Sequence, residues 1–288
     1  QLLSRTHAAM AAAGFGDSSW EFIAVDDASR DSTWQRLRDE SAGKPWLRGI
    51  RLSRHFGQHP ASFAGLNAAR GEIICTMDAD MQSPPEDLAR LVDKVEAGSD
   101  LVFGRRRHAE EGFLRERIGT AVNALLARHA EGNPPGGIST FLAARAGVVR
   151  EALRFHKSRP VTPYHLMLAG PEGAAAVEVG ESLRSLGSSK YSLLKLFSLT
   201  MDIFFGYTRL AEWALLFTAT AVPAGSIAIW LVAMLAALVN LQAISAFLAL
   251  GGLFYTVASL SALVFLAGEA AIRARRDDGP LYVVRETF

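Results

Sequence analysis

The sequence contains a single cysteine and almost no excess of charge of either sign, and each of these absences excludes some classes of protein. Its 288 residues include 30 lysines and arginines against 29 aspartates and glutamates, so no global positive field favours nucleic acid as a partner. One cysteine, Cys75, cannot form a disulfide framework, which fits a reducing compartment. A GxxxxGK loop, a GxGxxG helix start and an HExxH pair are also missing, which removes the usual signals of NTPases, dinucleotide-binding proteins and zinc hydrolases.

Charge is missing altogether from one long stretch. Between Trp213 and Gly268 the chain has no Asp, Glu, Lys or Arg. Such a run is too long for one membrane span and suits two, at roughly 20 apolar residues each. The segment 240–243, NLQA, is the polar break, so we expect a transmembrane helical hairpin rather than a buried soluble one. Basic residues such as Arg209 and Arg273 flank the outer ends, which predicts that the globular part and the C-terminal tail are cytoplasmic.

Before this run, strand-like and helix-like segments alternate. Apolar strands are expected at 21–27, 48–54, 72–78 and 99–104, and helices at 59–70 and 84–98. This alternation favours an α/β domain with a mainly parallel, helix-covered sheet. Because the pattern opens with a helix, we expect a further strand upstream of Gln1.

Charged residues follow three of these predicted strands. Asp26 and Asp27 end the first, Asp78 and Asp80 end the third, and the basic cluster 104–107 ends the fourth. In such sheets ligands bind beyond the carboxyl ends of the strands, so these groups should meet on one rim, although the first pair alone could equally begin a turn. Alternate residues of an extended chain share a face, so the second pair needs a cation between its charges. The acids could bind Mg²⁺ or Mn²⁺, and the arginines could bind phosphate. Together they suggest a divalent cation that bridges the carboxylates to a diphosphate.

Five segments carry more specific patterns: VDDASRDST (25–33), SRHFGQHPASFAGL (53–66), MDADMQSPPEDL (77–88), GSSKYSLLKL (187–196) and GPLYVVRE (279–286). In this order, together with the two-helix hairpin, they resemble the membrane-anchored polyprenyl-phosphate glycosyltransferases of glycosyltransferase family 2. That group includes dolichyl-phosphate mannose synthases, undecaprenyl-phosphate glucosyltransferases and transferases that load 4-formamido-arabinose onto undecaprenyl phosphate. The resemblance covers nearly the whole chain and implies a GT-A (Rossmann-like) fold.

The resemblance also implies roles for individual acidic residues. The first motif, Asp26 and Asp27, would contact the nucleotide. In the second motif, Asp78 would lie by the donor's sugar or ribose. Asp80 and Gln82 would hold the Mg²⁺ or Mn²⁺ ion, which makes Asp78 and Asp80 candidate catalytic residues.

The remaining implied roles concern phosphate groups and the membrane. Arg105 is expected at a donor phosphate and Arg115 near the acceptor phosphate, both as catalytic residues. Ser189, Lys190 and Tyr191 are expected on the approach to the membrane.

The sequence departs from the family pattern at three positions. Gly136 and Leu142 stand near the places of an acid and an arginine, and Gly119 stands where a serine is usual. The usual Pro-x-Tyr-Asn-Glu strand is also missing. These departures leave the donor sugar open.

The resulting domain prediction has four parts: a GT-A domain at 1–190, a juxtamembrane amphipathic helix at 191–210, two transmembrane helices at 211–269 and a cytoplasmic tail at 270–288. The predicted function is metal-dependent, inverting transfer of a sugar from a nucleotide-sugar, UDP-linked by preference, to a polyprenyl phosphate such as undecaprenyl phosphate. The enzyme would act at the inner membrane as a multi-pass protein, with a homo-oligomer possible. The alternatives are a dolichyl-phosphate mannose synthase-like enzyme using GDP-mannose, and a non-enzymatic membrane protein with a degenerate transferase domain.

Overall fold

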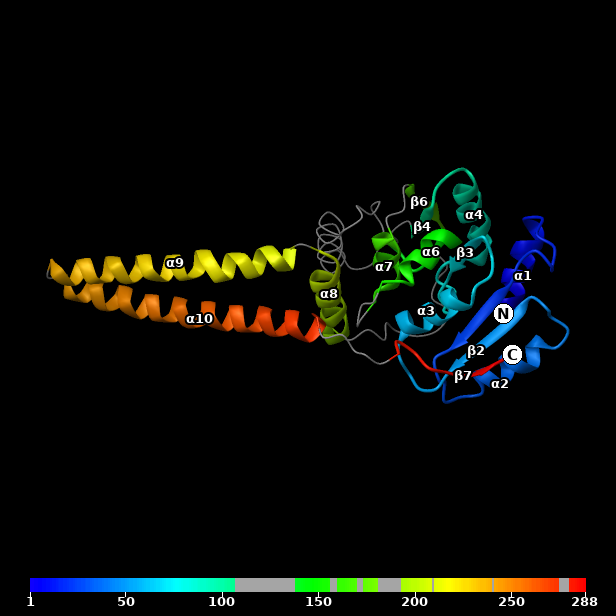
Figure 1. Ribbon diagram of the computed structural model, residues 1–288, viewed down its shortest axis with the longest axis horizontal. Coiled ribbons are helices and arrows are strands. Elements are labelled where there is room, and N and C mark those ends of the chain that lie inside the picture. The colour runs from blue at the N-terminus through cyan, green and yellow to red at the C-terminus, as the bar shows by residue number, and fades with distance from the viewer. Residues whose placement is uncertain are drawn as a thin grey trace. The chain divides into compact units, whose positions relative to one another are not determined.

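The computed structural model describes residues 1–106, 138–155, 160–169, 173–180, 193–208, 210–239, 241–274 and 280–288. The chain divides into two compact units, Gln1–Ile203 with Arg276–Phe288 and Phe204–Arg275. All of the described strands belong to the first unit, and the two longest described helices belong to the second (Figure 1).

The strands of the first unit form two described sheets. One has the order β1 (Phe22–Asp26), β2 (Leu47–Leu52) and β7 (Val284–Thr287). The other has the order β3 (Ile73–Thr76), β5 (Leu142–Arg145), β4 (Leu101–Arg106) and β6 (Ala174–Val179). The four strands predicted from the alternating pattern are therefore confirmed as β1 to β4.

The sheets are mixed, whereas the sequence predicted a mainly parallel sheet. β1 pairs with β2 and β4 pairs with β6 in parallel. β5 runs antiparallel to both β3 and β4, and β7 runs antiparallel to β2. The predicted strands do run in one direction within each sheet, and the antiparallel members come from outside the regular strand–helix alternation. β7 lies in the segment 270–288 that was predicted to be a C-terminal tail.

The helices of the first unit cover these sheets and include the predicted ones. They are α1 (Leu2–Ala12), α2 (Thr33–Ser41), α3 (Gln58–Ala68), α4 (Leu88–Glu96), α6 (Ala146–Ala152) and α7 (Thr162–Leu168), with the 3₁₀ turn η1 (Pro85–Asp87) before α4. α4 shows why the sequence folds locally as it does. Pro85 begins the turn that leads into it, and Gly98 beyond its end adopts a φ of 113° that glycine accommodates without strain.

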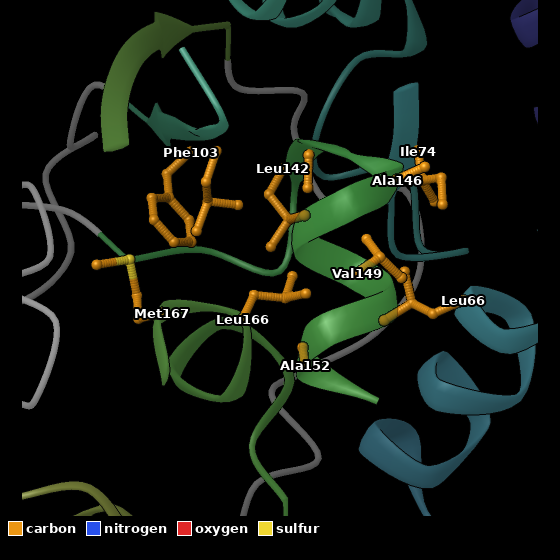
Figure 2. Close-up of a cluster of buried hydrophobic side chains, with 11 residues drawn as sticks. Leu66, Ile74, Phe103, Leu142, Ala146, Val149, Ala152, Leu166 and Met167 are labelled. Carbon is orange, nitrogen blue, oxygen red and sulfur yellow. The ribbon is translucent and has the colours of Figure 1, made fainter. Parts of the chain in front are cut away.

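The core of the first unit lies on both faces of β4. On one face the side chains of Leu101 and Phe103 join a cluster with β5 and α6, part of which Figure 2 shows. On the other face Val102 joins Leu91 and Val95 of α4. Successive side chains of a strand point to opposite faces, so a continuous apolar run is what a strand covered on both faces requires.

A single glycine of β4 tests how tightly this core is packed. A Cβ atom on Gly104 would lie 2.5 Å from Cδ1 of Phe141 and 3.2 Å from its carbonyl oxygen. We expect Gly104→Ala to lower the free energy of unfolding by about 1–3 kcal/mol, because the buried Phe141 has to move. Gly147→Ala in α6 is the matched control, since its Cβ would meet nothing within 4 Å. Thermal unfolding of both variants should show a loss only for Gly104→Ala, and equal stability would contradict the packing described.

The second unit is an apolar helical hairpin. Helices α9 (Leu210–Leu238) and α10 (Gln242–Ala274) run side by side (Figure 1). Gly225 lies against Tyr255, and Gly252 lies against Ile229, so small residues let the two helices approach closely. Most large apolar side chains on the two helices are exposed, among them Trp213, Phe247 and Phe254. Both helices are long and apolar enough to cross a membrane, as the sequence predicted.

Candidate active site

The first acidic residue, Asp26, ends β1 as a buried side chain. Its carboxylate Oδ1 accepts a hydrogen bond from the backbone N–H of Ser29 at 3.0 Å, which closes a turn. Its Oδ2 lies 3.3 Å from Nε of Arg51 on β2, and the Asp26 side chain is 0% exposed. Among the described residues these two atoms, Oδ2 and Nε, have no hydrogen-bond partner of good geometry. Ala28 within the turn has a φ of 56°, so the chain reverses sharply here.

The second acid, Asp27, holds the loop that connects β2 to α3. The backbone N–H groups of Phe56 and Gly57 donate to its two carboxylate oxygens, each at 2.8 Å. Nδ1 of His55 lies 2.7 Å from Oδ2 of the same carboxylate. Asp27 therefore fixes the 53–57 loop at the carboxyl end of β1.

The loop fixed by Asp27 leads directly to the second acidic motif. Gln58, the first residue of α3, donates from Nε2 to Oδ1 of Asp78 at 2.7 Å. The hydroxyl of Thr140, just before β5, donates to the other oxygen, Oδ2, at 2.9 Å. The two acidic motifs, which follow strands of two different described sheets, are thus linked through one short loop. Neither Gln58 nor Thr140 was among the predicted site residues.

Asp80 occupies a tight turn after β3. Its Oδ1 accepts a hydrogen bond from the backbone N–H of Gln82 at 3.1 Å, and Met81 between them has a φ of 59°. Asp80 is exposed, in contrast to the buried Asp26. Within the described part of the chain no three His, Cys, Asp or Glu side chains cluster as a complete metal site. A cation bound by the side chains of Asp80 and Gln82 would therefore need further ligands from other groups.

Arg105 lies on β4 beside an acidic neighbour. Its Nη2 is 3.3 Å from Oε1 of Glu178, the residue directly opposite on β6. Its side chain is 50% exposed. To contact a phosphate as predicted, the Arg105 guanidinium would have to turn away from Glu178 or bind Glu178 and the phosphate together.

The other predicted site residues lie outside the described residues, and the three departures from the family pattern lie either there or in the core. Arg115, Ser189, Lys190 and Tyr191 are outside the described residues, as are Gly119 and Gly136. Leu142 is fully buried in β5.

A partly buried histidine, His59, lies next to this site on α3. Nδ1 of His59 is 3.3 Å from the backbone nitrogen of Thr162, the first residue of α7, and accepts its hydrogen. Burial lowers the pKa of His59 below its usual 6.5, while the negative charge of Asp202 on α8 (Leu193–Tyr207) acts in the opposite direction. Because the downward effect prevails, the ring is neutral at pH 7.

The neutral His59 predicts a loss of stability in mild acid. Its pKa is lower in the folded than in the unfolded chain, so its full contribution is present above about pH 6.5 and is lost as the pH falls toward the folded pKa. We expect His59→Gln to flatten the fall in unfolding temperature between about pH 7.5 and about pH 5.5. The His7→Gln variant, which removes a partly exposed histidine of α1, is the control. An unchanged pH slope in His59→Gln would contradict this assignment.

The comparisons with known proteins agree with these features. Residues 1–155 match the family described as Glycosyl transferase family 2, and the chain belongs to this family. This membership, with the α/β domain and the two apolar helices, confirms the predicted family and the GT-A class.

Curated relatives carry more specific names. The undecaprenyl-phosphate 4-deoxy-4-formamido-L-arabinose transferase of Shewanella sediminis is 36% identical over 207 residues, covering 70% of this chain and 60% of the relative. The protein of the same name from Proteus mirabilis is 34% identical over 189 residues, covering 65% of this chain and 57% of the relative. The chain thus spans about three fifths of the length of the curated relatives it matches.

Solved structures show more distant likeness. Glucosyl-3-phosphoglycerate synthase from Mycobacterium tuberculosis has a TM-score of 0.46 and 20% identity, with 64% of this chain and 66% of that chain covered. TarS of S. aureus has a TM-score of 0.44 and 14% identity, with 71% and 60% covered.

Proposed function

We propose that the chain transfers a sugar from a nucleotide-sugar donor to a polyprenyl phosphate. The observation that carries this proposal is the link between the two acidic motifs. Asp27 fixes the loop that leads to Gln58, and Gln58 binds Asp78. One rim thus holds carboxylates suited to a nucleotide diphosphate with its cation. The names of the relatives, which are undecaprenyl-phosphate sugar transferases, support the same acceptor class.

We assign the two acids of the first motif to the nucleotide end of this rim. Asp26 is covered by protein, so it acts by holding the Asp26–Ser29 turn in shape. Asp27 acts by holding the 53–57 loop. Asp78, fixed by Gln58 and Thr140, is placed to orient the donor's sugar or ribose.

Asp80 and Gln82 fit a hard divalent cation by their chemistry. A carboxylate and an amide offer the oxygen ligands that Mg²⁺ and Mn²⁺ prefer, and such ions commonly complete their shells with phosphate oxygens and water. The Asp80 carboxylate is exposed, so a donor diphosphate can approach it. When bound, the cation would neutralise charge on the departing diphosphate.

The acceptor needs positioning more than activation. A phosphate monoester is already largely ionised near neutral pH, because its second pKa is about 6. A strong general base is therefore unnecessary, and the chain's own contribution is to hold the reacting groups in line. We assign Arg105 and Arg115 to the donor and acceptor phosphates, with inversion at the anomeric carbon as the family resemblance implies.

The same proposal places the apolar segments of the chain in or at a membrane. The hairpin 211–269 would span the inner membrane, with the transferase domain 1–190 and the tail 270–288 on the cytoplasmic side. Helix α8, within the proposed interfacial segment 191–210, carries Lys195 and Asp202 among mostly apolar residues, which suits a helix lying at a membrane surface. Ser189, Lys190 and Tyr191 would then meet the lipid headgroup.

A donor panel tests the nucleotide half of the proposal. Purified chain in detergent is heated with UDP-sugars, GDP-mannose or ADP-glucose, each with Mg²⁺ or with EDTA. We expect UDP-sugars to raise the unfolding temperature only when the metal is present, because a ligand that binds the folded state stabilises it. Stabilisation by GDP-mannose alone would favour the mannose donor, and no stabilisation by any nucleotide would contradict the proposal.

A further inference from the structure

The C-terminal strand β7 lies in the same sheet as the first acidic motif. β2 is the central strand, with β1 on one side and β7 on the other. Arg51 of β2 is directly opposite Asp26 on β1 and directly opposite Glu286 on β7. Residues directly opposite each other in a sheet project from the same face, so these three side chains form one acid–base–acid row.

A tryptophan of α2 covers this row. Nε1 of Trp34 donates to Oε2 of Glu286 at 3.0 Å, and the guanidinium carbon of Arg51 lies 5.9 Å from the centre of the Trp34 ring. Trp34 is only 5% exposed, so its indole N–H depends on Glu286 as a hydrogen-bond acceptor. Glu286 itself is 37% exposed and also lies 3.5 Å from Arg285.

Arg51 connects Trp34 and Glu286 to the turn that follows β1. Its Nε lies 3.3 Å from Asp26, and its Nη2 donates to the carbonyl oxygen of Ser29 at 3.3 Å. The guanidinium therefore touches both ends of the turn that follows the first acidic residue. Its orientation is set on its other side by Trp34, and Trp34 is set by Glu286.

The end of β7 is fitted closely to β2. Gly49 and Phe288 exchange backbone hydrogen bonds of 3.2 and 3.1 Å, and the Phe288 ring lies 5.0 Å from that of Trp34. A Cβ atom on Gly49 would overlap with the Phe288 ring. The C-terminal segment is thus hydrogen-bonded to β2 by its backbone, while Glu286 accepts a hydrogen bond from Trp34 and the Phe288 ring packs against Trp34.

We propose that β7 is a positioning element of the nucleotide end of the site: Glu286, through Trp34 and Arg51, holds the Asp26–Ser29 turn. Docking of β7 and binding of the donor nucleotide then strengthen one another, since coupling between two sites is reciprocal. Glu286 is a positioning residue and touches no substrate. This inference rests on the proposed function, because it takes the Asp26–Ser29 turn to lie at the nucleotide.

The first test compares Glu286→Ala, Glu286→Gln and the control Thr287→Ala in the full chain. Thr287 is an exposed neighbour on the same strand. We expect Glu286→Ala to weaken UDP binding in Mg²⁺ by about tenfold, and to raise KM for the donor by a similar factor with kcat within about twofold. The Gln variant keeps an acceptor for the Trp34 N–H, so it should recover part of the loss, and Thr287→Ala should match the parent.

The second test reads the coupling directly by hydrogen exchange. In the parent chain, UDP with Mg²⁺ should slow exchange at 284–287 as well as at 26–29. Glu286→Ala should speed exchange at both places. Gly49→Ala, which leaves Glu286, Trp34 and Arg51 unchanged, should displace Phe288 and weaken UDP binding in the same way.

The outcomes separate this inference from the proposed function. If the parent binds UDP and the Glu286 and Gly49 variants bind it equally well, β7 is only a structural strand and the inference is wrong. If the parent binds neither UDP nor GDP, the proposed function fails and the inference falls with it. Faster exchange at 284–287 without any change at 26–29 would also overturn the inference.

Discussion

Replacing Asp80 by alanine is expected to reduce sugar transfer by at least about a thousandfold, because it removes the one charged member of the proposed pair of metal ligands. The side chain is exposed on a turn, so the change should leave the fold intact. Initial rates of sugar transfer with saturating donor and Mg²⁺ or Mn²⁺ give the measurement.

The exposed Asp93→Ala on α4 is the matched control for this loss, since it removes the same side chain away from the rim. Unfolding temperatures of the two variants should agree with that of the parent. An Asp80→Ala variant that keeps more than about a tenth of the activity would show that the charge of Asp80 is not needed to hold the departing diphosphate.

Replacing Asp27 by alanine is expected to weaken donor binding by about a hundredfold, because two charge-assisted hydrogen bonds to the backbone are lost together. Without them the 53–57 loop is released, and Gln58 no longer stays at Asp78. Donor affinity and hydrogen exchange at 53–58 should both change. Asp27→Asn should recover little, since its amide group turns a donor toward one of the two backbone N–H groups.

Asp39→Ala, an exposed acid on α2, is the control for Asp27→Ala. The exchange measurement decides how Asp27 acts. Weaker donor binding with faster exchange at 53–58 supports its role as the anchor of the loop. Weaker binding with unchanged exchange there would mean that Asp27 contacts the nucleotide itself, as the family resemblance implies.

The sequence predicted the scaffold of this site well where its patterns were local. The apolar runs before Asp26 and Asp78 are strands, and the prolines and Gly98 bracket α4. The two acidic motifs were predicted to lie near one another because each follows a strand. The Gln58–Asp78 hydrogen bond does connect them, although β1 and β3 belong to different described sheets.

The parts that the sequence did not predict depend on long-range pairing. Thr140 hydrogen-bonds Asp78 although it lies 62 positions further along the chain, and no local sequence pattern identifies it. β7 pairs with β2 although the apolar hairpin separates them in the chain. The segment 279–286 was recognised as a family-like motif, but its pairing as a strand was not predicted. Gln58 did have a signal, because it begins α3 after the short 53–57 loop that follows β2. Arg105 was predicted from the basic cluster 104–107 and from the family motif, whereas its neighbour Glu178 follows from the pairing of β4 with β6.

Transfer of labelled sugar into an extractable lipid tests the central claim most directly. The full chain in membranes or detergent is given undecaprenyl phosphate and a panel of labelled UDP- and GDP-sugars, with Mg²⁺, with Mn²⁺ or with EDTA. We predict that label enters the organic phase from one class of donor, only when both the polyprenyl phosphate and a divalent metal are present. Absence of labelled lipid with every donor in the presence of metal, from a chain that is folded by thermal unfolding, would contradict the account.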